Sequence, residues 1–377
     1  FLSIFVQQDF AGRILPDIKG SGGMATRKDI AQRAGVSISV VSRALNNSGY
    51  VDAGKKKKIL QIAKELDYHP NPVAMSLMSQ HTKQILFYCR ELKNAFNIEM
   101  YEGMLEAAGE RDYKVLIYGN LDFSNIRSIM VDGLVLPNES VAEMYLNDIG
   151  KNYHLPVVTA SYGGSFSFSK SIPMIECDLW EGTRTALQYL WDRGHRKIAI
   201  ITPYDDDSRD SRLLSWHEFM KYELGDRIGQ YYFGINRRSL PNDDRLLAFP
   251  EERGPQSIYM LVSFFEKGLL AADIFHERSS DATAVLCFND EVALGFYKGL
   301  KQLGYKVPKD VSLMGVDGVY SRRYADLALT SLSLNPKAQG QKCVENLLNI
   351  IDGKKPKYIT QMPMRIMEGE TAQDLRH

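Results

Sequence analysis

The chain reads TRKDIAQRAGVSISVVSRALN from Thr26 to Asn46, and this stretch predicts two short helices around one tight turn. Thr26 followed by Asp29 makes a capping box for the first helix, and Gly35 permits the turn. Apolar residues recur at helical spacing and are expected to face a shared core. They are Ile30, Ala31, Ala34, Val36, Val41 and Leu45. Two short helices joined by a glycine turn are typical of the helix-turn-helix, whose second helix enters the DNA major groove.

The whole run resembles the DNA-binding head of the LacI/GalR family of bacterial repressors. That family reads T-x-x-D-I/V-A-x-x-A-G-V-S-x-x-T-V-S-R-x-L/I-N, and this chain departs from it at Val40, where the family usually has Thr. An ordinary helical hairpin is the alternative for the segment taken alone. The length of the match favours a DNA-binding head.

The second helix would present its first residues to the base edges. We expect Ile38, Ser39 and Arg43 to read bases, because Arg43 can donate a fork of hydrogen bonds to guanine and Ile38 can touch a thymine methyl. Hydroxyl and amide side chains around the two helices are expected to bind backbone phosphates. They are Thr26, Ser37, Ser42, Asn46 and Tyr50.

The net charge of the chain is zero, but the charge is unevenly distributed. Between Met24 and Lys83 there are ten basic and four acidic residues, so the remaining chain carries an excess of acids. A basic segment on an acidic body is expected of a protein that binds DNA phosphates. The four cysteines form no CxxC pair, which favours reduced thiols in a cytoplasmic protein. No apolar run reaches transmembrane length.

The head has predicted boundaries on both sides. Residues 1–23 start without Met and end in Gly-Ser-Gly-Gly, so we expect an added tag and a flexible linker there. Residues 24–69 are the predicted helix-turn-helix domain, in which Asp52 caps a third helix over 53–66.

Residues 70–83 are predicted to link the head to the body. Pro70 ends the third helix, and the following Asn-Pro pair predicts a new helix of about two turns, too short to persist alone in water. The segment resembles the family's hinge helix, which pairs across a dimer axis and wedges a Leu into the DNA minor groove. That resemblance assigns the minor-groove contact to Val73, Ala74 and Leu77. A plain linker is the alternative.

Beyond Lys83 the pattern alternates between strands and helices. The predicted strands are 84–89, 114–118, 133–137, 156–160, 174–177, 197–202, 230–233, 284–288, 312–316 and 358–366. The predicted helices are 98–111, 181–193, 211–223, 258–266, 291–303 and 337–352, with a shortened helix in 121–131. The stretch 224–254 is long, polar and hard to assign. Such alternation predicts parallel sheets covered by helices on both faces.

The fold class expected is therefore a small all-α head plus an α/β body of two doubly wound parallel-sheet lobes, over 84–370. The first lobe is expected to contain 84–193 and 336–360, and the second 196–333 and 361–370, followed by a tail over 371–377. The body resembles the periplasmic-binding-protein-like core of the same family, which binds effector and forms the dimer. The strings that carry this resemblance include RGHRKIA (193–199) and FNDEVALG (288–295).

Ligands of such sheets bind beyond the carboxyl ends of the strands. The resemblance implies that four residues bind ligand hydroxyls and that Phe96 stacks on the ligand. The four are Arg212, Asn289, Asp317 and Glu181. Asp290 is expected to cap the following helix instead. Carboxylates, an amide, an arginine and an aromatic face together suit a sugar or glycoside, which we favour over a purine.

No catalytic constellation is present in the sequence: there is no HExxH, no GxSxG and no phosphate loop, and no metal or cofactor is expected. The sequence therefore predicts a transcription repressor that binds a near-palindromic operator as a homodimer and is controlled by a small molecule. One alternative is a regulator of the same fold controlled by a protein co-repressor or a nucleobase. A more remote alternative is a solute-binding transport protein, which would share the body but not the basic head.

Overall fold

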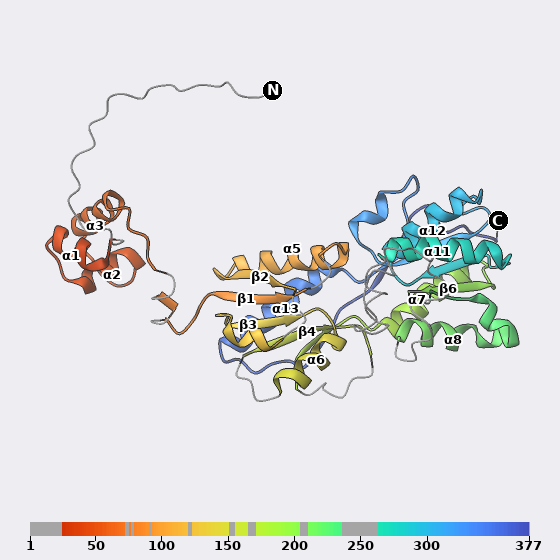
Figure 1. Cartoon of the computed structure of the whole chain (residues 1–377), viewed down its shortest axis with the longest axis horizontal. Helices are drawn as coiled ribbons and strands as arrows, with labels where there is room; N and C mark the ends of the chain where they lie inside the picture. Colours follow the sequence, from red (N-terminus) through yellow and green to blue (C-terminus); the bar gives the residue numbers. More distant parts are fainter. Residues whose placement is uncertain are drawn as a thin grey trace, which may run out of the picture. The chain divides into compact units, whose positions relative to one another are not determined.

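The computed structural model describes residues 25–71, 75–76, 79–89, 92–119, 123–150, 155–164, 171–203, 210–235 and 263–376. The chain divides into two compact units, one ending at Ser79 and the other beginning at Gln80. Each unit has its own hydrophobic core. Figure 1 shows a small helical head and a larger α/β body.

The head is the predicted three-helix unit, built from α1 (Arg27–Ala34), α2 (Ile38–Asn46) and α3 (Ala53–Glu65). Thr26 and Asp29 form both hydrogen bonds of the capping box, and Gly35 adopts a left-handed φ of 72° that ends α1. Ser37 caps α2 and Asp52 caps α3. The core contains the apolar residues expected from the helical spacing, joined by Ile59 and Ile62 of α3. The helix-turn-helix prediction is confirmed.

Only part of the predicted hinge is described. Met75 N–H donates to the Asn71 carbonyl at 3.0 Å, and Met75 and Ser76 are helical. Val73, Ala74 and Leu77, which the sequence assigns to the minor groove, lie outside the described residues.

The first lobe of the body is built on a parallel six-stranded sheet. Its order is β11-β5-β4-β3-β1-β2. The strands are β1 (Gln84–Tyr88), β2 (Lys114–Tyr118), β3 (Gly133–Leu136), β4 (Val157–Ser161), β5 (Met174–Glu176) and β11 (Ile359–Gln361). Successive residues of β1 belong to different clusters, Ile85 and Phe87 to one and Leu86 and Tyr88 to the other, so both faces are covered. Helices α5 (Ala95–Gly109) and α13 (Pro336–Ile351) pack together in this lobe, as do α6 (Glu139–Ile149) and the 3-10 helix η1 (Phe123–Ser128).

The second lobe repeats this plan. Its sheet has the order β12-β10-β9-β8-β6-β7, and only the β10–β12 pairing is antiparallel. The strands are β6 (Ile198–Thr202), β7 (Tyr232–Gly234), β8 (Ala284–Cys287), β9 (Ser312–Asp317), β10 (Thr330–Ser333) and β12 (Arg365–Met367). Its helices are α7 (Leu179–Asp192), α8 (Ser211–Leu224), α11 (Phe264–Glu277) and α12 (Asp290–Gln302), with 3-10 helices η2 (Gly225–Tyr231) and η5 (Tyr320–Arg323). Figure 1 shows α11 and α12 on one side of this sheet and α7 and α8 on the other.

Several expected boundaries need correction. Helix α7 was expected in the first lobe, but it contacts α8, β8 and β10 of the second. The single closing strand predicted over 358–366 is two strands, β11 and β12, which join different sheets. The helix predicted over 258–266 ends too early, because α11 extends from Phe264 to Glu277, and 258–262 lie outside the described residues. The sequence analysis also missed α6 and β10.

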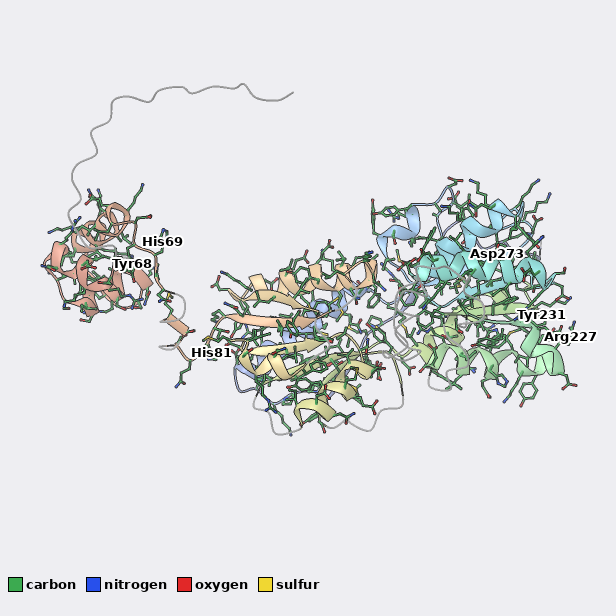
Figure 2. All side chains as sticks on the ribbon, in the orientation of Figure 1. Tyr68, His69, His81, Arg227, Tyr231 and Asp273 are labelled. Atoms are coloured by element: carbon green, nitrogen blue, oxygen red, sulfur yellow. The ribbon has the colours of Figure 1, made fainter. Side chains whose placement is uncertain are left out.

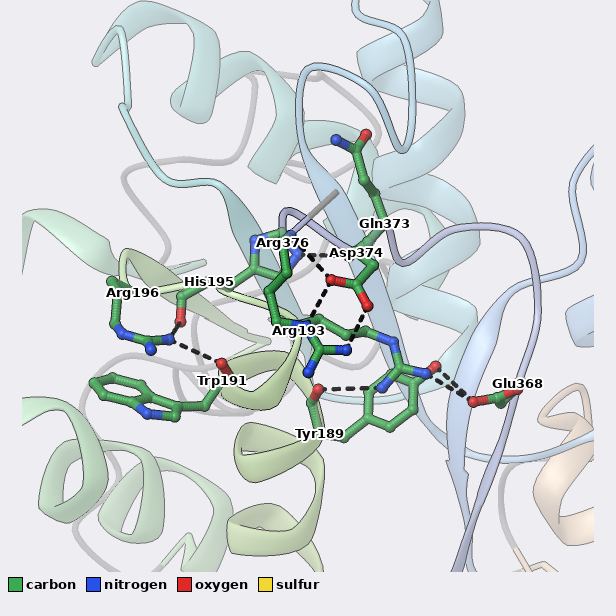
Figure 3. A network of polar contacts seen from close by, with 9 residues as sticks. All are labelled: Tyr189, Trp191, Arg193, His195, Arg196, Glu368, Gln373, Asp374 and Arg376. Carbon is green, nitrogen blue, oxygen red and sulfur yellow. Dashed lines mark hydrogen bonds and ion pairs between the residues drawn. The ribbon is translucent and has the colours of Figure 1, made fainter.

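The residues after β12 are not the tail that the sequence predicted. Thr371 is buried, and its hydroxyl donates to the Leu313 carbonyl at 2.7 Å. His195 is buried and bonds Thr283 Oγ1 at 3.0 Å and the Gln373 carbonyl at 3.1 Å. Figure 3 shows this segment held against the residues that follow α7. Residues 371–376 are therefore part of the second lobe.

Close helix packing in both lobes depends on glycine. A Cβ built on Gly103 of α5 would lie 1.9 Å from the Lys337 carbonyl oxygen of α13, and one on Gly340 of α13 would lie 2.0 Å from the Met100 carbonyl oxygen. The α11–α12 pair of the second lobe has the same reciprocal arrangement, through Gly268 and Gly295. The backbones of each pair can approach this closely only because neither carries a side chain at the crossing.

This packing predicts a large difference between two glycines of one helix. Gly103→Ala should destabilise the body by about 1–3 kcal/mol, because the added methyl meets backbone that cannot move away. Gly109→Ala, with nothing within 4 Å of the new Cβ, should be neutral or stabilising. Urea unfolding of the two variants would measure the difference, and equal stabilities would contradict the packing argument.

The docking of the C-terminal segment predicts a pH dependence. Burial lowers the pKa of His195, although the Gln373 carbonyl opposes the effect. The buried imidazole is therefore neutral. Its full contribution to the free energy of unfolding is present above the usual histidine pKa of about 6.5, and it is lost as the pH falls through the lowered pKa of His195 in the folded protein. Between about pH 7.5 and about pH 5, the thermal midpoint of wild type should decrease more than that of His195→Gln. His276→Gln, at an exposed histidine of α11, is the control and should behave as wild type.

Candidate functional site

The head presents one polar face on α2. Ile38 is 50% exposed despite being apolar, and Ser39 and Arg43 are exposed beside it. Arg43 Nε donates to the Ser39 carbonyl at 3.4 Å, while the Ser37 and Ser39 hydroxyls are 2.8 Å apart. The three residues expected to read bases thus lie together at the start and middle of one exposed helix.

Arg27 connects two elements of the head. Its guanidinium donates to the Tyr68 hydroxyl at 3.1 Å and to the Ser42 hydroxyl at 3.3 Å. Figure 2 labels Tyr68 just beyond the end of α3. Ser42, expected to bind phosphate, is therefore only partly exposed and already accepts a hydrogen bond, whereas Ser37, Asn46 and Tyr50 are exposed. Thr26 is exposed too, but its hydroxyl serves the capping box.

In the body, the candidate site lies where the carboxyl ends of the two sheets meet. Glu99 of α5, in the first lobe, accepts a hydrogen bond from the Tyr320 N–H of the second lobe at 2.6 Å. The Ser211 hydroxyl of α8 donates to the Gly163 carbonyl, just after β4, at 2.9 Å. Burial raises the pKa of Glu99, although the Tyr320 N–H opposes this. The region bounded by these contacts is called the interlobe site below.

Arg212 enters the interlobe site already paired. Its Nε and Nη2 donate to the two carboxylate oxygens of Asp210 at 3.2 and 2.9 Å, and its Nη1 donates to the Phe288 carbonyl at 3.1 Å. The guanidinium carbon also lies 3.3 Å from the centre of the Phe288 ring. Burial would raise the pKa of Asp210, but the Arg212 charge and hydrogen bonds outweigh burial and lower it.

Asn289 has the capping role that the sequence analysis assigned to Asp290. Asn289 is the N-cap of α12, since its side chain accepts from the Val292 N–H at 2.8 Å. Asp290 does not cap the helix. Its carboxylate is fully buried, and it accepts from the Ser331 hydroxyl at 2.5 Å and the Val319 N–H at 2.9 Å. Burial raises the pKa of Asp290, and its hydrogen bonds only partly oppose this.

Asp317 ends β9 with an unusual backbone and a largely buried side chain. Its φ is 113°, a region that L-residues rarely adopt, and it is 9% exposed. Within the described part of the chain, no hydrogen bond reaches its carboxylate. Burial raises the pKa of Asp317 well above its usual value, and the charge of Asp290 adds to the effect. Buried carboxylates without partners are uncommon because they cost stability.

The first lobe contains a counterpart of Asn289 and Asp290. Asn138 caps α6 through the Val141 N–H at 3.0 Å, and the next residue, Glu139, is buried. Glu139 accepts from the Ser161 hydroxyl at 2.7 Å and from the Tyr162 N–H. Burial raises the pKa of Glu139, and these hydrogen bonds oppose it.

The remaining two predicted residues are placed differently. Phe96, in the first turn of α5, is buried, and its ring meets Tyr162 edge to face at 5.8 Å. Burial raises the pKa of Tyr162, and nearby acids including Asp317 add to the effect. Tyr162 is next to Gly163, whose carbonyl accepts from Ser211, so Phe96 lies close to the interlobe site. Glu181 is exposed in the first turn of α7, and no polar contact among the described residues joins it to the other four.

Sequence reasoning missed Asp210, Glu99 and Glu139. Asp210 carries a local signal, since an acid two residues before Arg212 occupies the N-cap of a predicted helix. Glu139 could have been found from the repeated pattern of strand, Asn and acid in both lobes. Glu99 has no local signal, because its role depends on a residue 221 positions away.

Several expected absences can be checked only over the described ranges. There, no group of three or more His, Cys, Asp or Glu residues is arranged to hold a metal ion. None of the four cysteines is in a disulfide, and all four are buried. No helix in the same ranges has the length and apolar character that crossing a membrane requires.

Two family models match the chain. The model for bacterial regulatory proteins of the lacI family matches residues 26–71, and the model for a periplasmic-binding-protein-like domain matches residues 187–372. A helix-turn-helix head and a two-lobed α/β body define the class of ligand-controlled DNA-binding regulators.

Whole-chain comparisons agree with these matches. The HTH-type transcriptional repressor PurR of Vibrio cholerae serotype O1 is 28% identical over 363 residues, covering 93% of this chain and 99% of PurR. The Escherichia coli O1:K1 PurR is also 28% identical. The Lac repressor dimer bound to operator and the anti-inducer ONPF superimposes with a TM-score of 0.74 at 21% identity, covering 93% of this chain and all of that one. The chain belongs to the LacI/GalR family of transcriptional regulators.

The raised pKa of Asp317 predicts that wild type is less stable than a neutral variant. Because the folded-state pKa of Asp317 is raised, ionisation opposes folding above the usual aspartate pKa of about 3.9. Asparagine also tolerates a positive φ. At neutral pH the thermal midpoint of Asp317→Asn should be higher than that of wild type, and this difference should vanish near about pH 4. Unfolding curves across this range would measure it. A less stable Asn variant at neutral pH would show that the carboxylate has a partner.

Proposed function

We propose that the protein is a transcriptional repressor that binds a near-palindromic operator as a homodimer. A small molecule would lower or raise its affinity for the operator. Residues 24–69 would form the DNA-binding domain, 70–83 the hinge, and 84–370 the effector-binding and dimerisation domain. The observation that carries the proposal is the exposed face of α2, where an apolar residue, a hydroxyl and an arginine stand together on a capped helix.

The roles on DNA follow from side-chain chemistry. Arg43 can donate two parallel hydrogen bonds to guanine, Ile38 can contact a thymine methyl, and Ser39 tolerates several bases. Thr26, Ser37, Ser42, Asn46 and Tyr50 would fix the head on backbone phosphates. Arg27 supports this surface, since it holds Ser42 and Tyr68 together from α1.

The effector would bind at the interlobe site, through Asp317, Asn289 and Arg212 on the second lobe and Phe96 on the first. Glu181 was expected to join them, and its exposed position gives that assignment less support. A ligand that contacts both lobes favours one arrangement of the lobes over others, and so couples to the hinge and the head.

A sugar or glycoside remains the favoured effector. A transcriptional regulator solved as a CelR–cellobiose complex superimposes with a TM-score of 0.59 at 20% identity, so the fold accommodates such a ligand. A nucleobase effector or a protein co-repressor is the alternative. A transport role is less well supported, since a solute-binding protein has no use for a DNA-binding head.

Selection of bound duplexes from a random DNA pool, with and without candidate effectors, tests the proposal. We expect enrichment of an inverted repeat. A protein that retains no inverted repeat over scrambled duplex at moderate ionic strength would refute the repressor role.

The base-reading role of Arg43 makes a separate prediction. Arg43→Ala should weaken binding to the selected operator by about 1–3 kcal/mol and relax the preference at one base position. Lys57→Ala, at an exposed lysine of α3, is the control for general charge loss and should weaken specific and random duplexes alike. If Arg43→Ala also weakened both equally, the arginine would contact only phosphates.

A further inference from the structure

A buried carboxylate lies at the amino edge of the first-lobe sheet, where the chain enters the body. Asp132 directly precedes β3, and its side chain is 7% exposed. Its Oδ1 accepts from the Thr82 N–H at 2.7 Å and from the Thr82 hydroxyl at 2.8 Å, and its Oδ2 accepts from the Lys83 N–H at 3.1 Å. His81, labelled in Figure 2, places Nδ1 3.5 Å from the same Oδ2. Residues 81–83 together with Asp132 are called the linker clamp below.

Backbone hydrogen bonds attach the linker clamp to the neighbouring strands. The Asp132 N–H donates to the Gln84 carbonyl at 2.7 Å, and the Lys114 N–H, at the start of β2, donates to the Lys83 carbonyl at 2.9 Å. The Lys83 ammonium also lies 4.3 Å from the centre of the Tyr113 ring. The last residues of the predicted linker are therefore held at the amino ends of β1, β2 and β3.

The linker clamp fixes the direction of the chain as well as its position. Gln80 and Lys83 have left-handed φ angles of 58° and 56°. Residues other than glycine adopt this region at a cost, and they keep it where surrounding contacts require it. Releasing the linker would also remove these donors from a buried carboxylate, which costs stability. The chain therefore turns at fixed places before it enters β1.

The linker clamp is separate from the interlobe site. Strands β1 and β3 pair in parallel, with the clamp at their amino ends and the interlobe site beyond their carboxyl ends, toward Phe96 and Glu139. Strand β1 is five residues long, so its two ends are about 16 Å apart. The role of Asp132 can therefore be tested without altering the residues proposed to bind effector.

We propose that Asp132 is a positioning residue for operator binding, which fixes where and in which direction the hinge leaves the body and so sets the spacing of the two half-sites. The proposal rests on the operator binding proposed above. In a homodimer the two linker clamps are related by symmetry, so the two hinges start from points at a fixed separation. Released linkers would reach half-sites over a wider range of separations. Asp132 thus selects operators by their spacing and reads no base.

Two operators that differ only in spacing test this role. One is the inverted repeat selected as described above. The other carries one extra base pair between the half-sites, which moves one half-site by about 3.4 Å and rotates it by about 34°. The quantity measured with the full-length protein is the ratio of the two dissociation constants. A less stable body would lower the active fraction and weaken both operators equally, so the ratio isolates the positioning role.

We expect a ratio of about tenfold or more for wild type and of about threefold or less for Asp132→Ala. Thr82→Val removes the hydroxyl but keeps both backbone donors, so it should give an intermediate ratio even if Asp132→Ala does not fold. Thr82→Ser keeps the hydroxyl and should behave as wild type. Glu110→Ala removes an exposed carboxylate at the end of α5 in the same lobe, and this matched control should keep the wild-type ratio.

Hydrogen exchange tests the linker clamp in the absence of DNA. The Thr82 and Lys83 amides of wild type should exchange slowly, and Asp132→Ala should accelerate both by about tenfold or more. The amides of Ile85 and Phe87, within β1, should remain protected in both proteins, which would show that the variant is folded.

The proposal is overturned if Asp132→Ala keeps the wild-type spacing ratio, if Glu110→Ala lowers the ratio as much, or if the Thr82 and Lys83 amides exchange alike in Asp132→Ala and wild type. A protein that selects an inverted repeat but shows an unchanged ratio in Asp132→Ala loses only the positioning role. A protein that selects no inverted repeat loses the repressor role and the positioning role together, and the exchange rates then decide only whether Asp132 holds the linker.

Discussion

The same interaction supports both lobes of the body. In each lobe, a buried acid in the first turn of a helix accepts hydrogen bonds from residues at the carboxyl ends of the strands. Asp290 binds Ser331 and the Val319 N–H, and Glu139 binds Ser161 and the Tyr162 N–H. An asparagine precedes each acid and caps the helix, so the acid is free to reach across the edge. A buried carboxylate costs stability unless it is satisfied, and both acids therefore fix the loops that surround the interlobe site.

The site inherits its properties from this support. Asp290 binds the N–H two residues beyond Asp317, so the loop that displays Asp317 is held by another carboxylate. Burying two neighbouring acids costs stability, and such a cost is common at ligand-binding sites. Arg212 differs from Asp317, because its guanidinium is already paired with Asp210 and stacked on the Phe288 ring.

Local patterns predicted the parts of this structure that local physics determines. The capping box at Thr26, the turn at Gly35 and the long strand-helix alternation all rest on neighbours in sequence, and each was found. Lobe membership of α7, the division of 358–366 between two sheets and the docking of 371–376 depend on contacts between distant segments, which no periodicity reports. The same distinction applies to the candidate site. Asn289 could be predicted because it directly follows a strand in the sequence, whereas the contact of Glu99 with Tyr320 depends on how the two lobes meet.

The placement of β11 and β12 has a consequence for synthesis on the ribosome. Both sheets begin far upstream, yet each gains its outer strand from the short stretch between Ile359 and Met367. Neither sheet is complete until that stretch has left the exit tunnel. The edge of β5 therefore waits for β11 through most of the synthesis of the body, whereas the edge of β10 waits for β12 only briefly. The head has a core of its own, so it can fold long before then, and the head and the body thus mature at different times.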